Sequence, residues 1–233
     1  MAMHRTQRSS DLLWMQRALR LAEGVRGHVW PNPPVGCVIV TNGDFIAEAA
    51  THPGGRPHAE RKALDFAGAE ANGATLYVTL EPCCHWGKTP PCADAIIEAG
   101  VSRVVCAIQD PDPRVNGGGF AKLRRAGVEV SVGLGAETAT KHMSGFFHRI
   151  RTGLPELVAI SQGAVGVPDG EDAILVTCTQ GTELTTRSGT KENLKQPPHQ
   201  LMRWMGELGL TSVAIPQDDP LWQTLPIKQT AWS

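Results

Sequence analysis

The chain has 233 residues, of which 41% are hydrophobic and 19% charged, enough apolar side chain for a packed core and too little charge for a disordered chain. Its 22 Lys and Arg residues balance 23 Asp and Glu residues, so there is no surplus of positive charge of the kind that a dedicated nucleic-acid binder needs. No segment has the apolar run of a signal peptide or a membrane span. We therefore expect a cytoplasmic protein with reduced cysteines and no membrane partner.

Helical and strand patterns alternate along the first part of the chain. The predicted helices cover residues 10–27, 57–71, 90–99 and 117–126, and the predicted strands cover 35–40, 45–51, 75–80, 103–108 and 128–132. The turn sequence Asn42-Gly43-Asp44 joins the first two strands into a hairpin. A hairpin followed by alternating helices and strands favours an α/β fold with a mixed five-stranded sheet and helices on both faces.

The rest of the chain has a different composition. A helix is predicted at 137–151, and Gly153-Leu154-Pro155 ends it. Beyond this break the chain is rich in Thr, Gln, Gly and Pro, with predicted strands at 157–161, 173–178 and 211–215 and a helix at 201–208. We therefore predict a first domain at 1–152 and a small α+β region at 153–233.

Three short motifs carry residues suited to metal chemistry. His58-Ala59-Glu60 opens a predicted helix, Glu81-Pro82-Cys83-Cys84-His85 follows a predicted strand, and Thr89-Pro90-Pro91-Cys92 opens the next helix, with Thr89 as its expected cap. Strand ends and helix N-termini are where an α/β sheet usually builds a site. The positive end of a helix also favours the thiolate that a metal requires.

His58, Cys83 and Cys92 give Zn²⁺ three ligands, which leaves the fourth tetrahedral position to water, as in a catalytic site. Glu60 is too far round its helix to face the same ion, but from the first turn it can reach that water as a proton shuttle. A metal-binding His-x-Glu followed by Pro-Cys and a later Cys is typical of zinc deaminases, although eight residues separate the cysteines here where two are usual. The alternative is a closed structural site in which Cys84 or His85 is the fourth ligand.

Four strings of this sequence, PNPPVG, HPGGRPHAE, TLEPCCHWGKTPPC and QDPDPRVNGGG, resemble the deaminase domain of the bifunctional deaminase/reductase (RibD) family of riboflavin biosynthesis. The resemblance covers residues 8 to 155. It implies a three-layer α/β/α cytidine-deaminase-like fold and a zinc-dependent aminohydrolase that acts on a pyrimidine ribosylamine phosphate. It also implies one zinc per chain, held by His58, Cys83 and Cys92, with Glu60 as the proton shuttle.

Further positions match the family's substrate-binding stretches. By this resemblance, the base and ribose would be surrounded by Asn32, His52, His85, Lys88 and Thr89. Asp110 and the glycine-rich turn that includes Gly117 match the stretch near the sugar phosphate, where turn amides suit an anion. Two positions depart from the family, which usually has Ser at Cys84 and Asn at Asp112. The extra carboxylate of Asp112 would repel a phosphate unless Arg114 offsets it.

The C-terminal region departs further from the family. The string HQLMRWMGELGLTSVAI resembles the helix and strand that precede the nucleotide loop of the family's reductase domain, but PQDDP follows in place of glycines. We therefore expect a degenerate reductase-like region without an NADPH site, with a role in packing or in a homodimer contact. An unrelated small appendage is the alternative.

These features predict zinc-dependent hydrolytic deamination of a phosphorylated diaminopyrimidine, without reductase activity. Three other functions stay open at the level of the sequence. The chain could be a related base or nucleoside deaminase with an altered substrate, a catalytically silent homologue that binds a nucleotide or a partner enzyme, or a polynucleotide deaminase, which the net charge disfavours.

Overall fold

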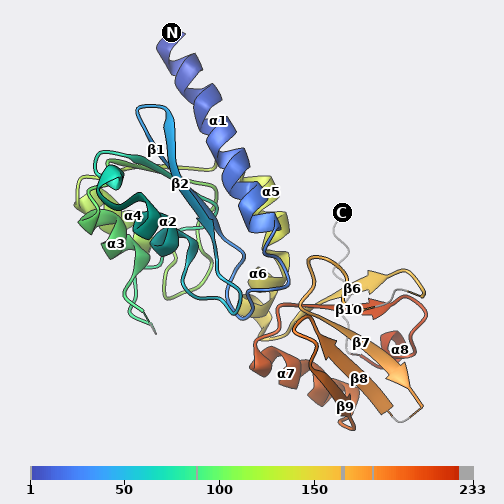
Figure 1. The fold of residues 1–233 in the computed structure, drawn as a ribbon. Coiled ribbons are helices and arrows are strands. Elements are labelled where there is room, and N and C mark those ends of the chain that lie inside the picture. The colour runs from blue at the N-terminus through green and yellow to red at the C-terminus, as the bar shows by residue number, and fades with distance from the viewer. Residues whose placement is uncertain (1, 88, 164–165, 180, 226–233) are drawn as a thin grey trace. The chain divides into compact units, whose positions relative to one another are not determined.

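The computed structural model describes residues 2–87, 89–163, 166–179 and 181–225, and it divides the chain into two compact units (Figure 1). The first unit comprises Met1–Val25 and Pro33–Met143, and the second comprises Arg26–Asn32 and Ser144–Ser233. The short segment that contains Asn32 is therefore counted with the second unit, although it lies early in the sequence.

The first unit is built on one sheet and the helices around it. Its strands are β1 (Gly36–Thr41), β2 (Asp44–Ala50), β3 (Thr75–Val78), β4 (Arg103–Cys106) and β5 (Glu129–Val132). Its helices are α1 (Ala2–Glu23), α2 (Ala59–Ala67), the short 3₁₀ helix η1 (Gly68–Ala71), α3 (Cys92–Glu98), α4 (Gly118–Arg125) and α5 (Ala136–His142). The strand order is β2-β1-β3-β4-β5. Strand β1 pairs antiparallel with β2 and β3, whereas β3, β4 and β5 run parallel.

Helices cover both faces of this sheet. Helices α1 and α5 lie on one face and α2, α3 and α4 on the other (Figure 1). Met15 and Ala18 of α1 are fully buried in a cluster with Val38 of β1 and Tyr77 of β3. The mixed five-stranded sheet between two helical layers, predicted from the alternation of patterns, is confirmed. Because β3 and β4 are parallel, the segments that follow them leave the sheet at the same edge.

A buried ion pair ties α1 to the sheet. Asp11 accepts two hydrogen bonds of 2.8 Å from the guanidinium of Arg103 on β4 and one of 2.7 Å from the hydroxyl of Tyr77 on β3. Burial raises the pKa of Asp11, but the hydrogen bonds from Arg103 and Tyr77 outweigh it and leave the pKa below its usual value. The carboxylate is thus the shared acceptor of two strands.

The second unit contains a smaller sheet. Its strands β6 (Glu156–Ile160), β7 (Ala173–Cys178), β8 (Gly181–Thr186), β9 (Lys191–Leu194) and β10 (Ser212–Pro216) are ordered β6-β10-β7-β8-β9. Strand β10 is parallel to β6 and β7, and β7, β8 and β9 form an antiparallel meander. Helices α6 (Ser144–Thr152), α7 (Pro198–Leu208) and α8 (Leu221–Thr224) accompany it. Its core includes the buried side chains of Leu175, Leu184, Met205 and Ile215.

Three sequence predictions need correction. The first helix begins at Ala2 instead of residue 10, because the segment before Ser10 has no Gly or Pro to stop it. The helix predicted at 137–151 is two helices, α5 and α6, interrupted at Met143, whose φ of −111° is not helical. The polar strands β8 and β9 were not predicted, since only alternate or terminal residues in them are buried.

Within the described residues, no helix combines the length and the hydropathy needed to cross a bilayer.

We expect Asp11→Ala to lower the free energy of unfolding by about 3 to 5 kcal/mol, because it removes the shared acceptor of the partly buried Arg103 guanidinium and the Tyr77 hydroxyl. Urea denaturation followed by circular dichroism measures the loss. Asp65→Ala is the matched control, since Asp65 pairs with Arg61 on the exposed face of α2 and such pairs contribute less than about 1 kcal/mol. Equal losses for the two variants would contradict the anchoring role of Asp11.

Candidate metal centre and active site

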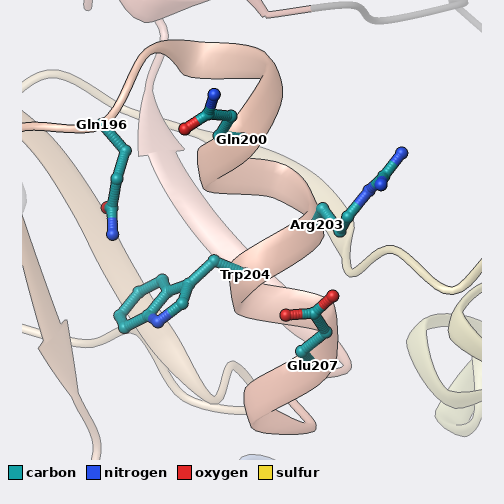
Figure 2. A pocket seen from close by; sticks show the side chains of 5 residues that line it. All are labelled: Gln196, Gln200, Arg203, Trp204 and Glu207. Carbon is teal, nitrogen blue, oxygen red and sulfur yellow. The ribbon is translucent and has the colours of Figure 1, made fainter.

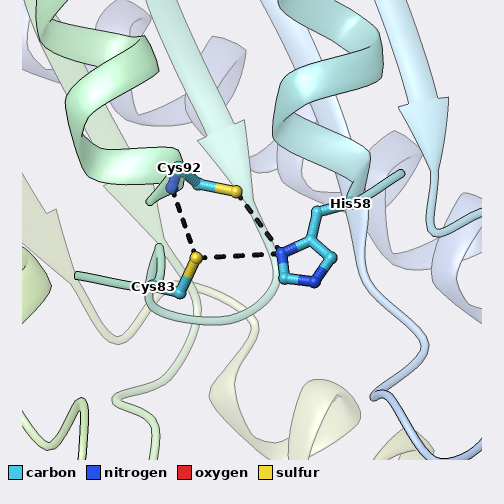
Figure 3. Close-up of side chains that lie close together, drawn as sticks. All are labelled: His58, Cys83 and Cys92. Carbon is cyan, nitrogen blue, oxygen red and sulfur yellow. Dashed lines mark hydrogen bonds between the residues drawn. The ribbon is translucent and has the colours of Figure 1, made fainter. Parts of the chain in front are cut away.

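Three side chains from three different segments converge at one point. Nδ1 of His58 lies 3.4 Å from Sγ of Cys92 and 3.8 Å from Sγ of Cys83 (Figure 3). Among the described His, Cys, Asp and Glu residues, these three form the one group whose potential ligand atoms all lie within 4.8 Å of one another. The three residues predicted as metal ligands are therefore brought together by the fold.

The spacing of these atoms suits zinc. With Zn–N near 2.05 Å and Zn–S near 2.3 Å, a tetrahedral ion places a nitrogen and a sulfur ligand about 3.6 Å apart. The two observed nitrogen–sulfur distances, 3.4 and 3.8 Å, bracket that value. Both sulfurs face Nδ1 of His58, while Nε2 is buried and meets no protein acceptor within the described part of the chain. The donor set and its geometry therefore fit a zinc ion on Nδ1.

Local structure explains how each ligand is presented. His58 is the N-cap residue of α2, with extended backbone, and Cys92 is the first residue of α3. The amide of Cys92 donates to Sγ of Cys83 over 3.2 Å, and the amide of Ala93 donates to the carbonyl of Cys83. The N-terminus of α3 thus holds the other ligand loop in place.

The predicted cap of α3 is wrong. Thr89 does not cap the helix, because α3 begins at Cys92 with Pro91 as its N-cap residue. A residue before proline is pushed to extended backbone, so the consecutive Pro90 and Pro91 delay the helix start. Thr89 instead accepts a hydrogen bond of 2.5 Å from Nη1 of Arg56.

A hydrogen bond between Cys83 and Cys92 moves the pKa values of the two thiols apart. A hydrogen bond with Cys92 lowers the pKa of Cys83 to about 4, and the same bond raises the pKa of Cys92 well above its usual value. A hydrogen bond to Cys83 also raises the pKa of His58. The lowered pKa of Cys83 favours its thiolate, which is the form in which a cysteine binds a metal.

Glu60 lies in the first turn of α2 beside the three ligands. Its side chain is 4% exposed, and burial raises the pKa of its carboxyl to about 7, although the neighbouring His58 opposes the shift. It also forms a hydrogen bond with the thiol of Cys92. A buried carboxyl that both gains and loses a proton near neutral pH has the property that a proton shuttle requires.

The closed structural site gains no support from the fourth-ligand candidates. The thiol of Cys84 points away and donates to the carbonyl of Arg114 over 3.6 Å. Nδ1 of His85 is buried and has no hydrogen-bond partner among the described residues. Neither residue belongs to the cluster formed by His58, Cys83 and Cys92.

The predicted substrate-binding residues occupy several segments. His52 is exposed in the loop before α2, with Nδ1 2.8 Å from the carbonyl of Pro53. His85 and Thr89 lie on the loop between Cys83 and α3. Asn32 is in a turn of the segment counted with the second unit, where its amide donates to the carbonyl of Val29. Lys88 lies outside the described residues.

Asp110 and its neighbours form a network after β4. Asp110 is buried, and burial raises the pKa of its carboxyl to about 6. Its Oδ1 accepts the amide of Asp112, whose carboxylate pairs with the guanidinium of Arg114. The ion pair expected to offset the charge of Asp112 is therefore present.

Two residues that bridge the loops around the site have no role predicted from the sequence. Arg56 links the loop before α2 to Thr89. Glu81, 3% exposed, accepts hydrogen bonds from the amides of Asp110, Gly117, Gly119 and Phe120. The amide of Gly117 is therefore engaged by a carboxylate of the protein itself. Neither contact has a local sequence signal, because the partners are 33 residues apart for Arg56 and between 29 and 39 residues apart for Glu81.

The second unit has a hollow of different chemistry beside α7. Figure 2 shows its lining, with a volume of about 460 Å³, formed by Gln196, Gln200, Arg203, Trp204 and Glu207. These side chains supply amides, an indole and one pair of opposite charges. They include neither a thiol nor an imidazole, so this hollow differs in its chemistry from the centre at His58, Cys83 and Cys92.

Residues 8–108 match the family model for the zinc-binding region of cytidine and deoxycytidylate deaminases. The chain is 49% identical over 165 residues to the riboflavin biosynthesis protein RibD of Escherichia coli, a match that covers 69% of this chain and 45% of that protein. It is 47% identical over 145 residues to the diaminohydroxyphosphoribosylamino-pyrimidine deaminase of Buchnera aphidicola (subspecies Schizaphis graminum), a match that covers 62% of this chain and 99% of that enzyme. The chain therefore spans less than half of the bifunctional relative and nearly all of the single-function one.

Solved structures extend the similarity beyond the first unit. RibD of Acinetobacter baumannii superposes with a TM-score of 0.73 at 28% identity and covers 89% of this chain and 80% of that one. A deaminase/reductase of Thermotoga maritima superposes with a TM-score of 0.74 at 28% identity and covers 93% of this chain and 83% of that one. The predicted fold class agrees with both structures.

We expect the purified chain to hold one zinc ion, and His58→Ala and Cys92→Ser to lose it, because each variant removes one of only three protein ligands. Metal content by mass spectrometry after gel filtration measures the stoichiometry. Cys178→Ser, at the exposed end of β7, is the control and should keep full zinc content. Unchanged zinc in Cys92→Ser would refute this ligand set.

Proposed function

Since the chain belongs to the diaminohydroxyphosphoribosylamino-pyrimidine deaminase family, we propose that it hydrolyses the amino group from a phosphorylated diaminopyrimidine ribosylamine. The observation that carries this proposal is the convergence of His58, Cys83 and Cys92 beside the buried carboxyl of Glu60. The reaction adds water to an amidine carbon of the ring and releases ammonia.

The chain's own residues supply a binding site for the metal and the route for the proton. His58, Cys83 and Cys92 would hold zinc, which supplies the Lewis acidity that makes water nucleophilic at neutral pH. Three protein ligands leave one position of a tetrahedral ion to water. The N-terminus of α3 stabilises the negative charge of the two sulfurs.

Glu60 performs the proton transfer. It accepts a proton from the attacking water and donates it to the departing amino group, so the carboxyl ends the cycle in the state in which it began. Burial, which raises its pKa to about 7, makes both steps accessible at neutral pH. Because only 4% of Glu60 is exposed, little bulk water competes for the proton.

The substrate would be held by the loops around the metal. Nδ1 of His85 has no hydrogen-bond partner among the described residues. Thr89 accepts a hydrogen bond from the guanidinium of Arg56 on the facing loop. Asp110 presents a carboxyl from the segment after β4. We propose that these side chains, together with His52 and Lys88, select the ring, the ribose and the phosphate.

We propose further that the region at 153–233 is a shortened reductase-like region without an NADPH site. Its similarity to the deaminase/reductase of Thermotoga maritima, which covers 93% of this chain, supports the reductase-like fold. The turn after β10 supports the proposal that the region has no NADPH site. It carries Asp218 and Asp219, and Asp219 accepts hydrogen bonds from the amide and hydroxyl of Thr177 and from the amide of Leu221. A carboxylate therefore takes donors that a phosphate loop would offer to its ligand, and its charge repels phosphate.

Glu60→Gln should lower turnover by about 10² to 10⁴-fold, because a carboxamide cannot accept the proton from water. The zinc content should stay at the wild-type level, since Glu60 is not a ligand. Ammonia release from the pyrimidine ribosylamine phosphate, together with metal analysis of the same sample, measures both quantities.

The control for Glu60 is Glu70→Gln, an isosteric change at an exposed residue of η1, which should leave turnover unchanged. Ammonia release by Glu60→Gln at the wild-type rate would exclude the carboxyl as the proton shuttle. No ammonia release by the wild-type chain would refute the proposed substrate or the activity itself.

NADPH should neither bind to the chain nor be oxidised during turnover, because the turn after β10 presents carboxylates where a nucleotide phosphate would need free amides. Equilibrium dialysis measures binding, and absorbance at the reduced nicotinamide band measures oxidation. Saturable NADPH binding would contradict the proposal for the second unit.

A further inference from the structure

We infer that Glu81 is the positioning residue for the substrate-facing loop between β4 and α4, which spans residues 107–117. This inference rests on the proposed function, because the loop carries Asp110, one of the proposed substrate contacts. Glu81 is the third residue after β3 and lies two residues before Cys83, one of the proposed metal ligands. It therefore belongs to the metal-binding segment, while its hydrogen-bond partners belong to the next segment of the sheet edge.

Each carboxylate oxygen of Glu81 accepts two hydrogen bonds from backbone amides. Oε2 accepts the amides of Asp110 at 3.2 Å and Gly117 at 2.9 Å. Oε1 accepts the amides of Gly119 at 2.9 Å and Phe120 at 3.2 Å. Four donors on two buried oxygens require a group that offers only acceptors, which a carboxylate does and a carboxamide does not.

The packing around Glu81 leaves the loop little freedom. A Cβ at Gly119 would lie 2.1 Å from the carbonyl oxygen of Pro82, so only glycine allows α4 to approach the metal-binding segment this closely. A Cβ at Gly118 would lie 2.8 Å from Sγ of Cys84. The amide of Glu81 itself donates to the carbonyl of Ile108 over 3.0 Å. The segment after β3 is therefore packed closely against the segment after β4 at Glu81, Pro82 and Cys84.

Asp110 is fixed through this network. Its backbone is held by Glu81, and its Oδ1 accepts the amide of Asp112 over 2.9 Å. Glu81 therefore sets the position from which the Asp110 carboxyl meets the substrate, without touching the substrate itself. Since Asp110 contributes binding and not proton transfer, the loss of Glu81 should act mainly on KM.

Glu81→Gln tests the role, because it keeps the shape of the side chain and places an NH₂ group against two amide donors. We expect KM for the pyrimidine ribosylamine phosphate to rise at least about tenfold, with kcat within about threefold of wild type. Zinc content should be unchanged. Glu98→Gln, on the exposed end of α3, is the matched control and should leave KM, kcat and zinc unaltered.

A double-mutant cycle with Asp110→Asn separates positioning from general stability. If Glu81 acts through Asp110, Glu81→Gln should raise KM far less in the Asp110→Asn background than in the wild type. A merely structural role would give additive effects, with kcat and zinc falling together. Additivity, or an unchanged KM in the single variant, would overturn the inference.

Two further measurements cover the other outcomes. If Glu81→Gln does not fold, Glu81→Asp keeps the acceptors on a shorter arm and should still raise KM while retaining zinc and most of kcat; an unchanged KM there would overturn the inference. If the wild-type chain releases no ammonia, the proposed function fails instead, and amide hydrogen exchange tests the anchor directly. Faster exchange at Gly117 and Gly119 in Glu81→Gln supports it, and unchanged protection overturns it.

Discussion

The segments that follow β3 and β4 leave the sheet at the same edge because these two strands are parallel, and the centre depends on that constraint. Cys83 follows β3 after four residues, and α3 then returns Cys92 to it through a hydrogen bond from its own amide. His58 enters from the start of α2, across the same edge. His58, Cys83 and Cys92 come from three different segments of the chain. The edge of the sheet therefore brings an imidazole and two thiols to the spacing of tetrahedral ligands.

The electrostatics of the two thiols explain why this arrangement favours a cation over a closed protein contact. The hydrogen bond with Cys92 lowers the pKa of Cys83, which favours a negatively charged thiolate in a buried setting. Such a charge is costly unless a donor or a cation meets it. The amide of Cys92 and the imidazole of His58 partly meet it, and a zinc ion would do so fully. The same buried environment raises the pKa of Glu60, so metal binding and proton transfer both follow from the exclusion of water at this edge.

The sequence was sufficient to predict the sheet and the group of His58, Cys83 and Cys92 with Glu60 beside it, because each depends on local signals. Strand and helix periods locate the edge, and His58, Cys83 and Cys92 stand directly at those boundaries. The cap of α3 was wrong because Pro91 moves the helix start to Cys92 and frees Thr89 for Arg56. Strands β8 and β9 were missed because their exposed faces are polar. Glu81 could not be found by pattern, since its role exists only once α4 packs against the segment after β3.

The position of Glu81 also changes how the glycine-rich turn can be understood. Amides at the start of a helix attract an anion, which makes such a turn a natural phosphate site when it is viewed in sequence. Here the anion is already supplied by the protein. The amides of Gly117 and Gly119 point to Glu81, and the amide of Gly118 donates to the carbonyl of Val115. A substrate phosphate would have to displace the buried carboxylate of Glu81 from these amides. The carboxylates of Asp110 and Asp112 nearby would also repel it. The turn therefore serves to place the Asp110 carboxyl. Positive charge for a phosphate has to come from side chains such as Arg56 or Arg114, and Arg114 already pairs with the carboxylate of Asp112.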